Sequence, residues 1–359
     1  HNHRRGPAGF SRTDEAGLEP MANYATDLLP GRPYGAGVYA DGHVHVEHWT
    51  PTNADLERGT FRSVVVFGNQ LRVVNAVPTA ASDRHMRQAD VIGTTGTTTM
   101  KKLRVAVVGA GGTGSHVALA LVYLGFTDVL ILDDDIVETS NLNRLITATI
   151  ADIGAPKNLI TRRRMREVDA RIEVTALPGL RPDGTDRELH DVDLIIGCVD
   201  HDGPRDRLNQ IAIDTATPYL DIATGIDTST SPPTIGGRAV LVAPNGPCLH
   251  CLRELDPVEV SRWTKDPAQQ ALDRRHGYGS AGSTPSVVHL NGVTVHAAMA
   301  ELMAWISGHR PPAQYLDIDL SGFLAATGSS SGTRVAPRAP VPRAVACIAC
   351  GYRTVEAAG

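Results

Sequence analysis

A glycine-rich turn between a short apolar run and a helix-like run is the feature that most restricts the fold of this chain. Residues 105–108 are entirely apolar, residues 109–115 read Gly-Ala-Gly-Gly-Thr-Gly-Ser, and residues 115–124 favour a helix. A second apolar run follows at 129–132. A strand, a helix and a second strand within about thirty residues predict a parallel sheet, because parallel neighbours need a helical crossover between them.

The same alternation continues downstream. Apolar segments at 172–177, 193–199 and 219–223 alternate with helix-like segments at 158–168 and 205–215. The pattern predicts an α/β fold with a doubly wound, mainly parallel, Rossmann-like sheet.

The first hundred residues have a different character. Short apolar runs at 64–67 and 71–74 flank Gly68-Asn69, which predicts a hairpin. Residues 93–99 are all Gly and Thr, so we expect a loop or linker there and a domain boundary within 76–100. Residues 321–342 are rich in Gly, Ser, Ala and Pro, the composition of a surface segment.

Charge and hydropathy exclude some classes of protein. Lys and Arg number 34 against 39 Asp and Glu, a net charge of −5, which argues against a broad nucleic-acid or membrane surface. The sequence contains no apolar run near the roughly 18 residues that cross a bilayer, and no leading segment typical of a signal peptide. We therefore expect a cytoplasmic protein.

Four of the five cysteines form two C-x-x-C pairs, Cys248 with Cys251 and Cys347 with Cys350. In a reducing compartment, two such pairs predict a structural Zn²⁺ site of four thiolates. The alternatives are two unrelated reduced pairs or one redox pair. The fifth cysteine, Cys198, lies inside a predicted buried strand and is expected to be a packing residue.

The glycine-rich turn also predicts a nucleotide site. It fits G-x-G-x-x-G, and its glycines allow backbone amides to approach phosphates at the positive end of a helix; the candidate residues are Gly109, Gly111, Gly112 and Gly114. Asp133 follows Gly114 by 133 − 114 = 19 positions, a spacing that suits binding of ribose hydroxyls. An NAD-dependent dehydrogenase fits these residues equally well, and a turn without a nucleotide is the third alternative.

The residues after Asp133 favour a triphosphate. Asp135, Asn141 and Arg144 follow directly, and Lys157 comes soon after. A dehydrogenase has no need of these groups, whereas an enzyme that handles ATP must neutralise phosphate charge with cations and Mg²⁺. Asp200 ends a predicted strand at the carboxyl edge of the sheet and is a candidate Mg²⁺ ligand.

Together these residues resemble the ThiF/MoeB superfamily, the adenylating domain of ubiquitin-activating enzymes, over about residues 83–350. The string from Asp133 to Arg144, Lys157 and the segment from Asp200 onward carry the resemblance. The resemblance implies a homodimer in which Arg87 reaches the ATP site of the partner subunit, and it implies zinc on the two cysteine pairs. The chain departs from the family pattern at two positions, Leu145 and His201.

The first fourteen residues suggest a second metal site. His1, His3, Ser11 and Asp14 follow the pattern H-x-H, seven residues, S-x-x-D. Two imidazoles and a carboxylate hold zinc with a position left for water, and a serine nearby stabilises an oxyanion. The string resembles the JAB/JAMM metalloprotease motif, whose upstream glutamate is not in this chain. The alternatives are incidental histidines or, less well supported, an HNH nuclease.

These observations predict two domains, a partial α+β JAB/JAMM-like domain at 1–80 and a ThiF-like adenylation domain with a zinc-binding segment at 81–359. The predicted activity is ATP-dependent adenylation of the C-terminal carboxylate of a ubiquitin-like or sulfur-carrier protein, in a chain that also carries a JAB-type isopeptidase-like domain with a second, catalytic Zn²⁺. No thioester step is expected, because the one cysteine left after the zinc site, Cys198, lies in a predicted buried strand. The alternatives are adenylation of a peptide or tRNA-bound carboxylate, an NAD(P)-dependent oxidoreductase, and a scaffold that binds a ubiquitin-like partner.

Overall fold

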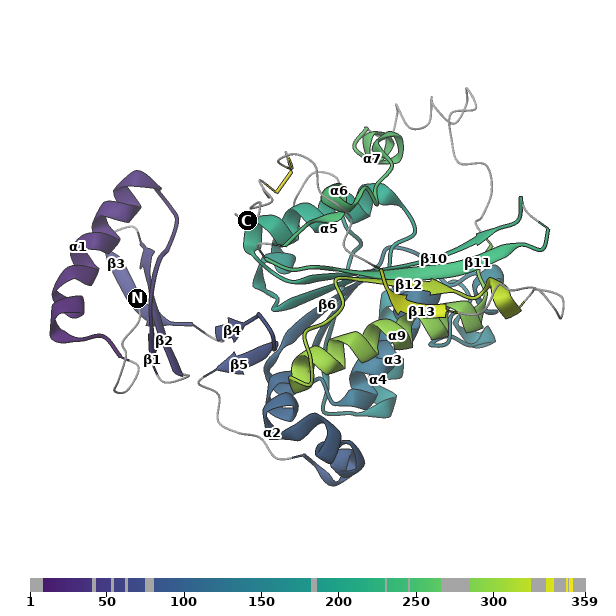
Figure 1. Ribbon diagram of the computed structural model, residues 1–359, viewed down its shortest axis with the longest axis horizontal. Coiled ribbons are helices and arrows are strands. Elements are labelled where there is room, and N and C mark those ends of the chain that lie inside the picture. Colours follow the sequence, from purple (N-terminus) through teal and green to yellow (C-terminus); the bar gives the residue numbers. More distant parts are fainter. Residues whose placement is uncertain are drawn as a thin grey trace, which may run out of the picture. The chain divides into compact units, whose positions relative to one another are not determined.

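The computed structural model describes residues 9–40, 43–52, 55–61, 64–74, 81–181, 186–229, 231–244, 246–265, 285–323, 334–338, 347 and 349–350. The chain divides into two compact units (Figure 1). One comprises residues 1–102 with 306–308, and the other comprises residues 103–305 with 309–359. Each unit is described by itself.

The N-terminal unit begins with helix α1 (Arg12–Leu28) and a sheet of three antiparallel strands, β1 (Tyr34–Ala40), β2 (His43–Pro51) and β3 (Leu56–Thr60). Leu18 and Ala22 of the helix pack with Trp49 of the sheet in a small apolar core. The predicted hairpin is confirmed, because β4 (Val64–Val66) pairs antiparallel with β5 (Arg72–Val74).

The expectation of a loop at residues 93–99 was wrong. After the short 3₁₀ turn η1 (Asp83–His85), these residues lie in helix α2 (Met86–Lys102), which is kinked at Gly93 with φ of 72°. Thr97 donates its hydroxyl to the Gly93 carbonyl, and Thr99 accepts from the amide of Val73. Burial and satisfied hydroxyls stabilise a helix that local propensity alone disfavours.

The larger unit holds an eight-stranded sheet among its described residues, in the order β13-β12-β11-β10-β9-β6-β7-β8. Neighbouring strands are parallel from β8 to β10 and antiparallel from β10 to β13. This confirms the predicted α/β class, and the antiparallel extension is what the sequence did not reveal. The strands are β6 (Arg104–Val108), β7 (Asp128–Leu132), β8 (Glu173–Leu177), β9 (Leu194–Gly197), β10 (Tyr219–Asp227), β11 (Thr234–Val242), β12 (Tyr315–Asp319) and β13 (Arg334–Pro337).

Helices cover both faces of this sheet (Figure 1). The predicted helices are present as α3 (Gly112–Leu124), α4 (Lys157–Val168) and α5 (Asp202–Thr215), and a long helix α9 (Val288–Ser307) follows. Short elements complete the described part: α6 (Leu249–Leu252), α7 (Pro257–Trp263), η2 (Thr139–Asn141), η3 (Ile150–Asp152), η4 (Arg187–Asp191) and η5 (Ser321–Phe323).

The strand order creates a switch point in the middle of the sheet. β6 lies between β7 and β9, so the chain turns to one side after β6 and later returns to the other. In open α/β sheets, ligands bind at the carboxyl ends of the strands beside such a point. The glycine turn after β6, Asp133 after β7 and Asp200 after β9 all follow strands at this edge.

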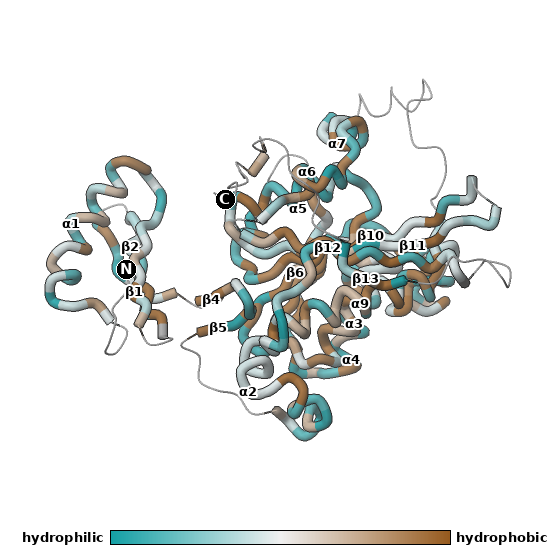
Figure 2. The backbone as a smooth tube through the Cα atoms, in the orientation of Figure 1, coloured by the Kyte–Doolittle hydropathy of each residue, from teal (hydrophilic) through white to brown (hydrophobic). Residues whose placement is uncertain are grey.

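Hydrophobic and hydrophilic residues are intermixed along the chain (Figure 2). Within the described residues, no helix combines the length and the apolar character needed to span a bilayer.

We predict that Leu121→Ala, which removes a fully buried side chain of α3, lowers the free energy of unfolding of the larger unit by about 2–5 kcal/mol through the cavity it leaves. Tyr123→Ala on the same helix is the control, because Tyr123 is 60% exposed and its loss should change stability by less than about 0.5 kcal/mol. Urea denaturation measures both. An equal loss of unfolding free energy in the two variants would contradict the burial of Leu121 in α3.

Candidate active site

The turn after β6 requires glycine at two positions because of close backbone approaches. Gly109 has φ of 91°, and a Cβ there would lie 2.7 Å from the carbonyl oxygen of Cys198. A Cβ on Gly114 would lie 1.8 Å from the carbonyl oxygen of Gly109. No side chain fits in either place, so the turn lies directly against the end of β9 and against the first turn of α3.

The other two glycines have different surroundings. Gly111 is the N-cap residue of α3, and a Cβ on it would meet nothing within 4 Å. A Cβ on Gly112 would lie 3.2 Å from the Cγ and Cδ atoms of Arg144 and 2.4 Å from the Nδ2 atom of Asn291. The first amides of a 13-residue helix therefore border open space, with an arginine beside them. That arrangement suits a phosphate group.

Asp133 lies next to the glycine turn, where the sequence placed it. Its Oδ2 accepts from the amide of Ala110 at 2.6 Å, and its Oδ1 accepts from the amide of Asp135 at 2.8 Å. Burial raises the pKa of Asp133, and the two amide hydrogen bonds oppose that rise. The carboxylate ties the end of β7 to the turn after β6.

Lys157 forms an ion pair with Asp135, with 2.7 Å between Nζ and Oδ2. The backbone amide of Lys157 also donates to the Asp135 carbonyl. The lysine is buried and the carboxylate of Asp135 is largely exposed. The two residues that the sequence assigned separately to the nucleotide thus form one unit at the start of α4.

Arg144 and Asn141 belong to the loop after β7. Arg144 donates through Nη1 to the carbonyl of Ser140 at 2.8 Å and to Oδ1 of Asn143 at 3.0 Å. The Oδ1 atom of Asn141 accepts from the amide of Glu138, which closes the short turn η2. Asn141 therefore shapes the loop that presents Arg144 to the glycine turn.

Asp200 follows β9, and its side chain is 89% exposed. The imidazole of His201 lies 3.8 Å from its carboxylate. An exposed carboxylate at the carboxyl edge of a parallel sheet has the chemistry and the access of a magnesium ligand.

Two of the four residues of the predicted N-terminal metal site, Ser11 and Asp14, have a role in the helix α1. Ser11 and Asp14 form a capping box at the start of α1, in which the Ser11 amide donates to Asp14 Oδ2 at 2.7 Å and the Asp14 amide donates to Ser11 Oγ at 3.3 Å. The S-x-x-D spacing is that of a capping box, which satisfies amides of the first helical turn. His1 and His3 lie outside the described residues. The zinc site predicted there therefore stays a prediction.

Arg87 is exposed on α2 in the N-terminal unit. Its assignment to the ATP site of a partner subunit stays a prediction.

The two cysteine pairs meet, as the sequence predicted. All four Sγ atoms lie within 4.8 Å of one another, and three of the distances are 3.8, 3.8 and 3.5 Å. An ion roughly 2.3 Å from each of four thiolates holds the sulfur atoms roughly 3.8 Å apart. The cluster therefore fits a tetrahedral zinc ion. Cys248 is the N-cap residue of α6, Cys251 lies within α6, and Cys347 and Cys350 come from a segment about a hundred residues further along the chain.

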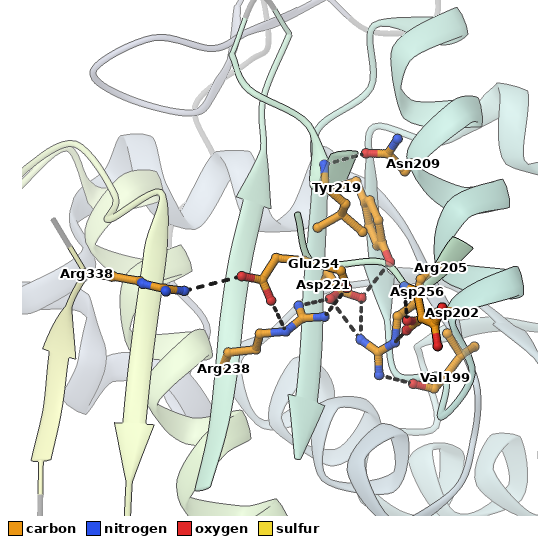
Figure 3. A network of polar contacts seen from close by, with 11 residues as sticks. Val199, Asp202, Arg205, Asn209, Tyr219, Asp221, Arg238, Glu254, Asp256 and Arg338 are labelled. Carbon is orange, nitrogen blue, oxygen red and sulfur yellow. Dashed lines mark hydrogen bonds and ion pairs between the residues drawn. The ribbon is translucent and has the colours of Figure 1, made fainter. Parts of the chain in front are cut away.

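A buried ionic network near the end of β9 was not predicted (Figure 3). Asp221 on β10 lies between Arg205 of α5 and Arg238 of β11, and Arg238 also pairs with Glu254. These charges come from elements far apart in the sequence, so no local spacing reveals them. Asn291 was missed for the same reason: it reaches the glycine turn from α9.

Comparison with known proteins gives the family. The model described as the ThiF family matches residues 83–332, a span that includes the glycine turn, Asp133, Asp200 and the first cysteine pair. The chain belongs to the ThiF family.

Relatives of this ThiF-family chain include two adenylyltransferases. The sulfur carrier protein adenylyltransferase of Thermus thermophilus is 30% identical over 213 residues, which cover 57% of this chain and 73% of the relative. The adenylyltransferase and sulfurtransferase UBA4 of Candida glabrata is 30% identical over 179 residues, which cover 48% of this chain and 40% of the relative. The crystal structure of Escherichia coli MccB with ATP shares the fold, with a TM-score of 0.53 and 19% identity over 76% of this chain and 75% of that one.

We predict that the purified ThiF-family chain contains about one tightly bound zinc ion. Cys350→Ser should remove most of it, because the tetrahedral set then lacks one thiolate. Cys198→Ser is the matched control and should leave the metal content unchanged. Elemental analysis after gel filtration measures both. A chain without zinc, or equal zinc in the two variants, would show that the four cysteines are not one site.

Proposed function

We propose that this chain is an ATP-dependent adenylyltransferase that activates the C-terminal carboxylate of a ubiquitin-like or sulfur-carrier protein. The observation that carries the proposal is the open space beside Gly111, the N-cap of α3, together with the aliphatic part of Arg144 beside the next residue, Gly112. A helix N-terminus binds phosphate oxygens, and an arginine that comes from the neighbouring loop can add its guanidinium to them.

The proposed reaction is attack by the carrier carboxylate on the α-phosphate of ATP. The oxygen–phosphorus bond of the acyl-adenylate forms, and the bond to pyrophosphate breaks. Arg144 and the first amides of α3 stabilise the negative charge on the transferring phosphoryl group. Asp133 holds the ribose hydroxyls, and Lys157 adds positive charge next to Asp135. Mg²⁺, which would neutralise the outer phosphates, is assigned to Asp200.

Family membership and the two named adenylyltransferase relatives support this reaction over hydride transfer. The pair formed by Lys157 and Asp135 and the position of Arg144 serve a triphosphate, and an NAD-dependent dehydrogenase needs neither. A homodimer in which Arg87 completes the partner's site belongs to the same proposal. The family match begins at residue 83, so the isopeptidase activity of the N-terminal unit stays a prediction that rests on the sequence motif.

We predict that the chain catalyses exchange of pyrophosphate into ATP when a carrier protein with a free C-terminal carboxylate is added. Arg144→Ala should lower the exchange rate by roughly 10²–10³, because it removes a donor to the transferring phosphoryl group. Arg164→Ala is the control, since Arg164 is exposed on α4 and pairs only with Glu167 among the contacts that the structure gives it. Hydride transfer to or from NAD by the wild-type chain, with no exchange activity, would overturn the proposed reaction.

We further predict that the acyl-adenylate is not passed to a thiol of this chain. Burial and the nearby Asp221 raise the pKa of the Cys198 thiol far above its ordinary value, so it is not a thiolate at neutral pH. Incubation with ATP and carrier should give no thiol-sensitive adduct on a non-reducing gel, and Cys198→Ala should leave pyrophosphate exchange nearly intact. A carrier adduct that dithiothreitol removes, and that Cys198→Ala abolishes, would show that Cys198 accepts the acyl group.

A further inference from the structure

We infer that Asp221 and Arg205 are positioning residues of the ATP site, which hold the loop between β9 and α5 so that Asp200 faces its ligand. The inference rests on the proposed function, because that function assigns Mg²⁺ to Asp200. It goes further by assigning a role to two residues that lie beneath the site and do not touch the nucleotide.

Arg205 connects the buried network to both sides of Asp200. Its Nη2 donates to the carbonyl oxygen of Val199, the residue before Asp200. Its Nε lies 3.5 Å from a carboxylate oxygen of Asp202, which starts α5 two residues after Asp200. One guanidinium therefore contacts both Val199 and Asp202 (Figure 3), which flank the dipeptide Asp200-His201. The side chain of Asp200 itself is exposed.

Asp221 fixes the guanidinium in that position. Arg205 Nη1 donates to Oδ1 and Oδ2 of Asp221 at 2.9 and 2.8 Å. The Tyr219 hydroxyl donates to Oδ1 at 2.7 Å, and Arg238 Nη1 donates to Oδ2. Asp221 is fully buried on β10, so the arginine is anchored to the sheet and not to a flexible surface group.

The carboxylate of Asp221 stays ionised in this environment. Burial alone raises its pKa, but attraction to Arg205 and Arg238 and the hydrogen bond from Tyr219 outweigh burial, and its pKa lies below the ordinary value. The negative charge of Asp221 is therefore balanced by two arginines, and Glu254 balances the second of these. Removing one member leaves an uncompensated buried charge, which destabilises the remaining contacts.

A second contact also holds Asp202. The amide of Asp256 donates to Oδ2 of Asp202 at 2.7 Å, so Asp202 is fixed by α5 and by the segment that follows the first cysteine pair. A loop held at several points needs no rearrangement when its ligand binds, which is the physical advantage of a preorganised site.

The experiment uses the full-length chain and two conservative variants, Arg205→Lys and Asp221→Asn. Lysine keeps the charge but cannot donate to Val199, Asp202 and both oxygens of Asp221 together. We expect the Mg²⁺ concentration for half-maximal pyrophosphate exchange to rise roughly 10–100-fold in both variants, as for other residues that orient a metal ligand. Arg207→Lys is the matched control, since Arg207 lies on the same helix and pairs with Asp186, away from this loop.

A second measurement separates positioning from loss of stability. Binding of Mn²⁺ with a non-hydrolysable ATP analogue, followed by electron paramagnetic resonance, should weaken in Arg205→Lys and Asp221→Asn and stay unchanged in Arg207→Lys, even where the thermal midpoints of all three fall. Tyr219→Phe removes only the hydroxyl that donates to Asp221. It should raise the Mg²⁺ concentration for half-maximal exchange by a smaller factor, and it replaces Asp221→Asn in the test if that variant does not fold.

The outcomes distinguish the two proposals. A wild-type chain that neither binds the Mn²⁺–nucleotide complex nor exchanges pyrophosphate would defeat the proposed function. A wild-type chain that does both, with Arg205→Lys and Tyr219→Phe matching Arg207→Lys in metal dependence, would defeat the positioning role and leave the function in place.

Discussion

The close approach of backbone to backbone at the glycine turn is the constraint on which the rest of the site depends. The carbonyl oxygen of Gly109 occupies the space that a side chain on Gly114 would need, and the carbonyl of Cys198 does the same for Gly109. These contacts fix the first turn of α3 and the end of β9 to one another. The helix start and the loop after β9, to which the proposed function assigns phosphate and Mg²⁺, therefore belong to one packed edge of the sheet.

The two halves of the sheet contribute differently to this edge. The parallel half brings the ends of β6, β7 and β9 together, so that the glycine turn, Asp133 and Asp200 lie at the same side of the sheet. The antiparallel half supplies buried charge from beneath, through Asp221 on β10 and Arg238 on β11. The proposed site therefore combines groups at the carboxyl ends of the parallel strands with buried charges on the antiparallel strands.

Local motifs predicted the parts of the site that are local in the chain. The glycine turn and Asp133 lie where their spacing indicated, because one strand-helix-strand unit contains both. Each C-x-x-C pair likewise follows from a short local spacing, and the two pairs meet as predicted. Ser11 and Asp14 show the limit of such reasoning, since the spacing that resembles a metal motif is also that of a helix cap. The Gly and Thr residues at 93–99 show a second limit of local reasoning, because burial in the tertiary structure stabilises a helix there.

The sequence by itself determined the α/β class, the glycine turn and each C-x-x-C pair, since periodicity, glycine content and ligand spacing are properties of neighbouring residues. Only the tertiary structure decided that Lys157 pairs with Asp135, that Asn291 reaches the turn from α9, and that Asp221 lies between Arg205 and Arg238. The physical reason is that a buried charge selects its partner by proximity in space, and the crossovers of the sheet bring together strands and helices that are distant along the chain.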